Sequence, residues 1–216
     1  MEGTLQSVGV TVLFSDITEL QELRDAAAAL DKIKLLNQKL ERLSFFDELT
    51  GLPNRRFFND TCNREWYRMM RTQRPLAFIM IDVDCFKELN DQHGHQTGDA
   101  CLIAVANTLN SVLKRPYDLI MRYGGDEFVI FLSCISSKGE VLRCVERIFR
   151  CFDNIYTDHV QNKNIANFSC SIGIAFSPEN GENFDVLVER ADMALYKAKR
   201  MGKNCCSIYS ENIQYQ

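Results

Sequence analysis

Two acidic stretches carry residue types that can bind a metal ion, and the first lies at residues 81–99. Asp82 and Asp84 close an apolar run that is typical of a buried strand. A carboxylate at a strand end can hold a hard cation such as Mg²⁺, together with a backbone carbonyl and substrate phosphates. Lys87 adds a positive charge in the loop that is expected to follow. Taken alone, this spacing is equally consistent with a capping or turn role for the two carboxylates.

The second acidic stretch is Arg-Tyr-Gly-Gly-Asp-Glu-Phe at residues 122–128. Its simplest interpretation is a tight hairpin turn, because paired glycines favour such turns. The alternative is that Gly124 and Gly125 let the backbone approach a ligand closely while Asp126 and Glu127 bring charge to the turn. If this turn lies beside the first stretch, Asp82 and Asp126 converge on one metal site of the kind that nucleotidyl transfer requires.

The periodicity of the chain predicts elements that would bring these two stretches together. We expect a helix over 54–71, a strand over 76–83, a loop and a helix over 97–113. A hairpin with strands over 118–123 and 127–133 follows, and then a helix over 139–156 and an alternating strand over 168–176. A helix over 184–201 and a short strand over 205–209 complete the series. The order βαββαβ, then αβ, predicts an α+β fold with a ferredoxin-like core, its helices on one face of an antiparallel-rich sheet.

Two segments precede this core. Residues 8–16 alternate and are rich in Val, which predicts a strand at the end of a truncated domain over 1–17. Residues 18–44 have leucines and isoleucine at 3,4 spacings without Gly or Pro, which predicts a long linker helix. This helix either pairs with a second copy in a parallel coiled coil or packs against its own domain. A step of three between Leu30 and Ile33 would overwind a coiled coil locally.

The composition excludes several classes of protein. The chain has 216 residues, a formal net charge of −4 and 46% apolar residues, which is typical of a globular protein. We find no apolar run long enough to span a membrane, no secretory signal and no basic block that would indicate nucleic-acid binding. The nine cysteines show no CxxC pair, so we expect free thiols and a cytoplasmic location, although a parent protein could be tethered to a membrane elsewhere.

Residues 45–210 resemble a GGDEF domain, the catalytic domain of the diguanylate cyclase family. The matching strings, in chain order, are DELTGLPNR at 47–55, DVDCFK at 82–87, NDQHGH at 90–95, GD at 98–99, GGDEF at 124–128, SIG at 171–173 and ADMALYKAK at 191–199. Residues 8–19, which end in FSDITE, resemble the last strand of a PAS sensor domain. The resemblance therefore implies a sensor remnant over 1–17, a signalling helix over 18–44 and a catalytic domain over 45–216, with a nucleotidyl cyclase-like fold.

The resemblance also implies roles for individual residues. Asp82, Asp126 and the Val83 carbonyl would bind Mg²⁺ or Mn²⁺, and Glu127 would help to activate the ribose 3′-hydroxyl of GTP. Guanine would be recognised by Asn90 and Asp99. The triphosphate would be bound by a larger set, namely Cys85, Phe86, Lys87, Gly124, Gly125, Lys199 and Lys203. Two positions depart from the family pattern: Cys85 replaces the usual aromatic, His or Asn residue, and the family often has Arg at the position of Lys203.

A further match to the family is Arg115-Pro-Tyr-Asp118, which has the form and position of its RxxD inhibitory product site. Arg can present a planar fork to phosphate and stack on guanine, and Asp118 can accept hydrogen bonds from a guanine edge. The alternative is a simple surface ion pair.

The implied function is condensation of two GTP into cyclic di-GMP by a homodimer that an upstream sensor domain regulates. Three alternatives remain open. A degenerate GGDEF domain would only bind GTP or cyclic di-GMP. A class III purine nucleotide cyclase would close an intramolecular ring and lacks this signature, and a dimerisation scaffold would need none of these polar residues.

Overall fold

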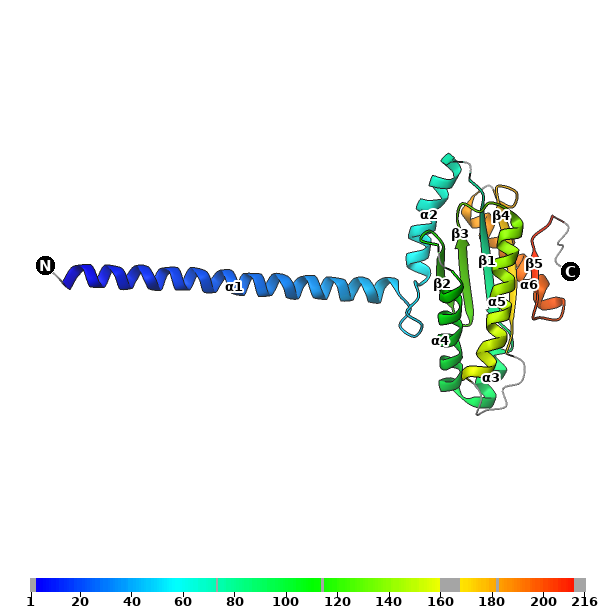
Figure 1. The fold of residues 1–216 in the computed structure, drawn as a ribbon, viewed down its shortest axis with the longest axis horizontal. Coiled ribbons are helices and arrows are strands. Elements are labelled where there is room, and N and C mark those ends of the chain that lie inside the picture. Colours follow the sequence, from blue (N-terminus) through cyan, green and yellow to red (C-terminus); the bar gives the residue numbers. More distant parts are fainter. Residues whose placement is uncertain (1–2, 73, 114, 160–167, 182, 212–216) are drawn as a thin grey trace. The chain divides into compact units, whose positions relative to one another are not determined.

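The computed structural model describes residues 3–72, 74–113, 115–159, 168–181 and 183–211 (Figure 1). The chain divides into two compact units, Met1–Ser44 and Phe45–Gln216. The first unit is helical: helix α1 covers Gly3–Phe45. Its apolar side chains with 3,4 spacing are at least half exposed; they are Leu20, Leu23, Leu30, Ile33, Leu36, Leu40 and Leu43.

The strand that we predicted over 8–16 is wrong, because α1 includes these residues. A strand satisfies its backbone hydrogen-bonding groups only by pairing with neighbouring strands, whereas a helix satisfies them within its own segment. Extending an existing helix also costs far less free energy than starting a new element. The assignment of residues 1–17 to a sensor domain stays a prediction.

The second unit alternates helices and strands in the order that the sequence predicts, with one additional helix. The helices are α2 (Arg55–Thr72), α3 (Phe86–His93), α4 (His95–Val112), α5 (Lys138–His159) and α6 (Phe184–Arg200). The strands are β1 (Leu76–Val83), β2 (Leu119–Gly124), β3 (Glu127–Leu132), β4 (Cys170–Ser177) and β5 (Cys206–Ile208). Helix α3 lies where we expected a loop. It has only eight residues between Cys85, in a left-handed conformation, and Gly94, so its periodicity is too short to detect.

The five strands form one sheet in the order β2-β3-β1-β4-β5. Strand β1 is central and antiparallel to both β3 and β4, and β5 is parallel to β4. The first four strands therefore have the predicted ferredoxin-like arrangement, with β5 as the extra strand. This topology places the end of β1 beside the turn that connects β2 to β3.

Helices cover both faces of the sheet. The two helices of the ferredoxin-like core, α4 and α5, lie on one face as predicted, whereas the cover of the other face by α2 and α6 was not predicted. Helices α4 and α5 lie over one face, where they pack against Ala77, Ile79 and Ile81 of β1 (Figure 1). Helices α2 and α6 pack on the other face against Phe78 and Met80. The reason is visible in β1 itself: all eight of its residues are buried, and a strand that is apolar on both faces needs cover on both.

Two predictions about the whole chain can be compared with this structure. All nine cysteines are free thiols, as expected. Among the described residues, no helix is both long enough and apolar enough to cross a membrane.

Candidate active site

The two acidic stretches meet at the end of the central strand. In the antiparallel pairing of β1 with β3, Asp82 lies opposite Glu127. The backbone N–H of Val83 donates a hydrogen bond to the carbonyl oxygen of Asp126 at 3.2 Å. Residues more than 40 positions apart in the sequence are thus held side by side by the backbone. The sheet therefore forms an acidic edge from Asp82, Asp126 and Glu127.

The electrostatics of this edge disfavour its own negative charge. Burial raises the pKa of Asp82, and the neighbouring carboxylates Asp126 and Asp84 reinforce the increase, although Lys199 opposes it. Burial, followed by the charge of Asp82, likewise raises the pKa of Glu127. Carboxylates held together in this way favour a nearby cation.

Lys199 of α6 supplies one such cation. Its ammonium Nζ lies 2.7 Å from Oδ2 of Asp82, whose side chain is only 10% exposed. The ion pair connects α6 to the end of β1, and the position of the ammonium shows that this edge accepts a positive charge. Asp82 and Lys199 both lie in motifs that match the family, but nothing in the sequence indicated that their side chains pair.

The donor set at this edge also suits a divalent metal ion, because its atoms are carboxylate and carbonyl oxygens, the ligands that Mg²⁺ prefers. In the described part of the chain, no cluster of three or more His, Cys, Asp and Glu side chains is arranged to hold a metal by itself. A metal here would therefore depend on Asp82, Asp126 and the Val83 carbonyl together with oxygens from a ligand. Magnesium commonly binds proteins in this way, through one or two carboxylates and substrate phosphates.

Asp84 has the structural role that the sequence left open. Its carboxylate accepts hydrogen bonds from the hydroxyls of Ser169 and Ser171, both at 2.7 Å, and from the backbone N–H of Asn204 at 3.0 Å. The side chain is thereby fully engaged by protein donors. Asp84 joins the end of β1 to the start of β4 and to the turn after α6.

An arginine that the sequence analysis did not single out fixes the hairpin turn. Gly125 adopts a left-handed φ of 55°, and its carbonyl accepts two hydrogen bonds from Arg122, at 2.9 Å from Nε and 2.7 Å from Nη2. The same guanidinium contacts both carboxylate oxygens of Asp47, at 3.0 and 3.1 Å. Burial alone would raise the pKa of Asp47, but hydrogen bonds from Thr50 and Arg122 outweigh it and lower the pKa. The segment after α1 is thus tied directly to the acidic turn.

The N-terminus of α3 continues the site beyond β1. Cys85 precedes the helix with a left-handed φ of 57° and is exposed, as is Lys87. The first backbone N–H groups of a helix attract anions, so this end of α3 can receive phosphate. Lys203, in the turn after α6, donates a hydrogen bond from Nζ to the Cys85 sulfur at 3.2 Å. The structure therefore brings Cys85, Phe86, Lys87 and Lys203 to one place.

Asn90 and Asp99 lie on neighbouring turns of α3 and α4. The Asn90 Oδ1 atom is buried and has no hydrogen-bond partner among the residues that the structure describes, while Asp99 is exposed. Gly98 makes room for this oxygen: a Cβ added at Gly98 would lie 1.9 Å from it. An acceptor left without a protein donor is suited to a ligand that carries donors.

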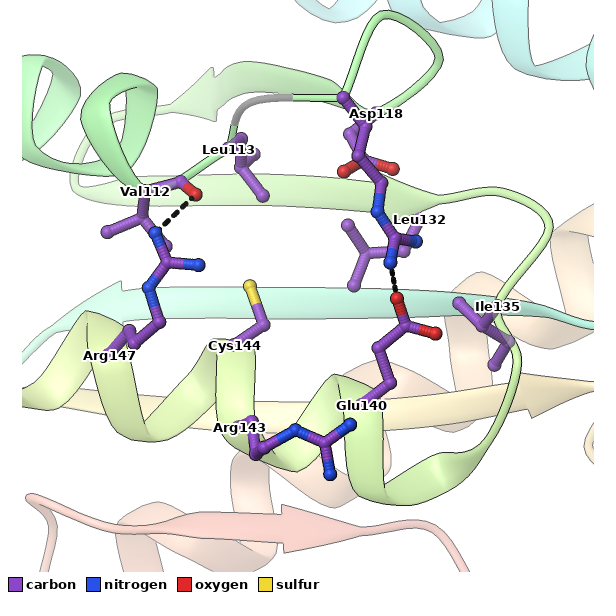
Figure 2. A pocket seen from close by; sticks show the side chains of 10 residues that line it. Val112, Leu113, Asp118, Leu132, Ile135, Glu140, Arg143, Cys144 and Arg147 are labelled. Carbon is purple, nitrogen blue, oxygen red and sulfur yellow. Dashed lines mark hydrogen bonds and ion pairs between the residues drawn. The ribbon is translucent and has the colours of Figure 1, made fainter.

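Arg115 and Asp118 open onto a separate pocket of about 420 Å³ (Figure 2). Figure 2 shows Cys144, Arg147 and Glu140 of α5 facing Asp118 and Leu113 across it. Burial raises the pKa of Asp118 although Arg115 opposes the increase, and its buried Oδ1 has no hydrogen-bond partner in the described ranges.

The contribution of α5 to this pocket was not predicted from the sequence. The contribution comes from Glu140 and from the residues three, four and seven positions after it, namely Arg143, Cys144 and Arg147, which share one side of the helix. Arg147 donates a hydrogen bond to the Val112 carbonyl at 3.1 Å. The helical spacing was the available signal, but it could not show that α5 packs beside Arg115.

Comparison with known proteins identifies the family. Residues 44–205 match the family model described as "Diguanylate cyclase, GGDEF domain". The chain belongs to the GGDEF domain family. The GGDEF domain accounts for most of the second unit, and the strings that carry the resemblance all lie within the match.

Curated relatives and solved structures agree with this assignment. The chain is 34% identical over 195 residues to diguanylate cyclase TpbB of Pseudomonas aeruginosa, and the matched region covers 87% of this chain and 44% of TpbB. It is 39% identical over 186 residues to diguanylate cyclase DosC of Escherichia coli, where the matched region covers 84% of this chain and 39% of DosC. The chain thus spans less than half the length of either relative.

Among solved structures, the coiled coil and GGDEF domain of DgcB from Caulobacter crescentus, in complex with c-di-GMP, matches with a TM-score of 0.77 and 27% identity. That match covers 87% of this chain and 97% of the DgcB chain. The GGDEF domain of TpbB matches with a TM-score of 0.71 and 34% identity, covering 78% of this chain and 96% of the other.

Proposed function

We propose that this chain is the catalytic part of a diguanylate cyclase, which condenses two GTP into cyclic di-GMP and releases two pyrophosphates. The observation that carries the proposal is the pairing of β1 with β3, which sets Asp82 opposite Glu127 and Val83 beside Asp126. A nucleotidyl transfer needs carboxylates and a metal at the reacting phosphate, and Asp82, Asp126 and Glu127 supply carboxylates at this edge.

The residues of the acidic edge divide the chemistry among them. Asp82, Asp126 and the Val83 carbonyl hold Mg²⁺ or Mn²⁺. The metal ion supplies Lewis-acid polarisation of the phosphate and a lower pKa for the attacking hydroxyl. Glu127, whose pKa burial and Asp82 raise, lies next to these ligands and accepts the proton of the ribose 3′-hydroxyl.

The surrounding residues position GTP. Asn90 and Asp99 accept hydrogen bonds from N1–H and the amino group of guanine, a pair of donors that adenine does not present. The triphosphate lies against the N-terminus of α3 and the hairpin turn, contacting Cys85, Phe86, Lys87, Gly124, Gly125, Lys199 and Lys203. Lys199 pairs with Asp82 in this structure and neutralises phosphate charge when GTP binds.

Catalysis requires two copies of the domain, because each holds one GTP and its 3′-hydroxyl attacks the α-phosphate of the GTP on the other. A homodimer formed through α1 brings the two domains face to face, and an upstream sensor domain controls their approach. The exposed apolar stripe of α1 supports this arrangement.

The first test is incubation of the purified chain with GTP and Mg²⁺, with products separated by chromatography. We expect cyclic di-GMP and pyrophosphate. Asp82→Asn and Asp126→Asn should each lose at least about 10²-fold in turnover, a typical loss when electrostatic stabilisation is removed. Asp60→Asn, at an exposed position of α2, serves as the matched control. Binding of GTP without turnover in the wild type would favour the alternative, a nucleotide-binding module.

We further propose that cyclic di-GMP inhibits the enzyme through Arg115 and Asp118. The pocket supports this because it combines three arginines for phosphate with an Asp118 oxygen that has no hydrogen-bond partner among the described residues and can accept from a guanine edge. Loss of the charge-assisted contact of Arg115 should weaken product binding about tenfold or more. In progress curves, Arg115→Ala should continue toward exhaustion of GTP while the wild type slows. Arg150→Ala, at an exposed position of α5, is the control, and identical curves for wild type and Arg115→Ala would leave only a surface ion pair.

A further inference from the structure

The pocket that contains Arg115 is also lined by a carboxylate of the protein itself, that of Glu140. Arg115 forms an ion pair through Nη2 with Oε1 of Glu140, which lies in the first turn of α5. The Glu140 side chain is only 17% exposed, whereas Arg115 is 50% exposed. The carboxylate therefore reaches the arginine from within the pocket, while half of the Arg115 side chain stays accessible to solvent.

Glu140 is held in this position by the two residues that precede its helix. Its Oε2 accepts a hydrogen bond from the backbone N–H of Ser136 at 2.8 Å, and its backbone N–H donates to the hydroxyl of Ser137 at 3.3 Å. Ser137 and Glu140 have the Ser-x-x-Glu spacing of a capping box, but the Glu140 carboxylate accepts from the N–H of Ser136, one residue before the usual partner. One oxygen of Glu140 thus binds the backbone just before α5, and the other pairs with Arg115.

The charges that line the pocket determine how the ion pair between Glu140 and Arg115 affects the binding of a phosphate ligand. Three arginines line it, namely Arg115, Arg143 and Arg147, together with the two carboxylates Asp118 and Glu140. A ligand with two phosphates needs the positive charges, so each carboxylate that lacks a hydrogen-bonding role toward the ligand opposes its binding. Asp118 has such a role in the proposed guanine contact, whereas Glu140 is directed at the arginine.

We infer that Glu140 is an internal competitor for Arg115, and that its carboxylate sets the concentration of cyclic di-GMP at which feedback inhibition begins. The inference rests on the proposed product site and deepens it. A product phosphate reaches the Arg115 guanidinium only after the ion pair with Glu140 has separated. The domain therefore binds its product more weakly than the three arginines alone would allow.

The variant Glu140→Gln separates the two roles of this side chain. The amide oxygen of Gln can still accept the hydrogen bond from the Ser136 N–H, but Gln carries no charge to pair with Arg115. Glu146→Gln is the matched control, because Glu146 is exposed on α5 and pairs with Arg150 rather than with a residue of the pocket. Thermal unfolding should show equal midpoints for the two variants and the wild type.

The measurement is the Kd of cyclic di-GMP for the full chain by isothermal titration calorimetry. Glu140→Gln should bind about three- to fivefold more tightly, in keeping with the modest contribution of an ion pair that has a half-exposed partner. Glu146→Gln should bind like the wild type. In the Arg115→Ala background, Glu140→Gln should give no gain, since the partner that it competes for is absent.

The possible failures are distinguishable. An unchanged Kd for Glu140→Gln, while Arg115→Ala still weakens binding, would overturn the competition and leave the product site in place. If Glu140→Gln still binds cyclic di-GMP more tightly in the Arg115→Ala background, the competition is also overturned, because the effect then comes from the change in net charge rather than from Arg115. If Arg115→Ala has the same Kd for cyclic di-GMP as the wild type, the product site and this inference both fail. The proposed cyclase activity is tested separately, by the turnover of GTP.

Discussion

Replacing Gly98 with alanine should damage substrate binding without damaging the fold. An added Cβ would lie 1.9 Å from Asn90 Oδ1, 2.9 Å from Asn90 Cγ and 3.1 Å from Phe86 Cζ. The Asn90 side chain must therefore turn away, which it can do because the closest atoms are at its flexible end. Gly98 is within α4, where Gly→Ala otherwise stabilises a helix by about 0.5–1 kcal/mol, and this gain offsets the local crowding.

The loss in function follows from the hydrogen bond to guanine that Asn90 can no longer make. One neutral hydrogen bond contributes about 0.5–1.5 kcal/mol, so the KM for GTP should rise about 2- to 13-fold. Steady-state kinetics and thermal unfolding are measured on the same preparation. Gly139→Ala is the control, because its Cβ would meet only ordinary contacts, the nearest at 3.5 Å. A folded Gly98→Ala variant with the KM of the wild type would refute the assignment of Asn90 to the substrate.

Three other predictions follow from the described contacts. Lysine cannot reproduce the paired contacts of Arg122 to Asp47 and Gly125. Arg122→Lys should therefore lower the free energy of unfolding by about 1.5–3 kcal/mol and reduce turnover. An unchanged free energy in urea unfolding would contradict this prediction. The pKa of Glu127 in the folded state lies above its ordinary value of 4.5. Ionisation of Glu127 therefore destabilises the folded state as the pH rises above 4.5. Glu127→Gln should therefore be more stable than the wild type at pH 8, with the difference shrinking toward pH 4 in urea unfolding; a constant difference would contradict the sign. A chain that begins near Leu43 should dimerise less than the full chain in light scattering, and equal monomer fractions would argue against a coiled coil.

The sequence predicted the parts of this structure whose signals are local. Strand β1 has the predicted bounds, because an apolar run ended by Asp82 and Asp84 has few other interpretations. The approach of Asp82 and Asp126 also followed from the sequence, since the element order specifies the topology and the topology brings these residues together.

What the sequence did not predict depends on contacts between distant segments. The pairing of Arg122 with Asp47, and that of Lys199 with Asp82, join residues 75 and 117 positions apart, and no periodicity reports such partners. The cover on the second face of the sheet was missed because α2 and α6 flank the βαββαβ core in the sequence. Residues 8–16 were assigned to a strand because they alternate and are rich in Val, a local signal that does not report whether a neighbouring strand is available for pairing.

Strand β1 belongs to two apolar cores at once, and this has a consequence for how the domain opens. Its alternate residues pack under α4 and α5 on one face and under α2 and α6 on the other. Neither layer can detach without exposing the same strand to water, so we expect the two layers to melt in one cooperative transition. Backbone amides in β1 should then exchange their hydrogens only through global unfolding. The residues at the end of this strand are consequently anchored in the slowest-exchanging part of the domain, which keeps the acidic edge in place while helices at the periphery fluctuate.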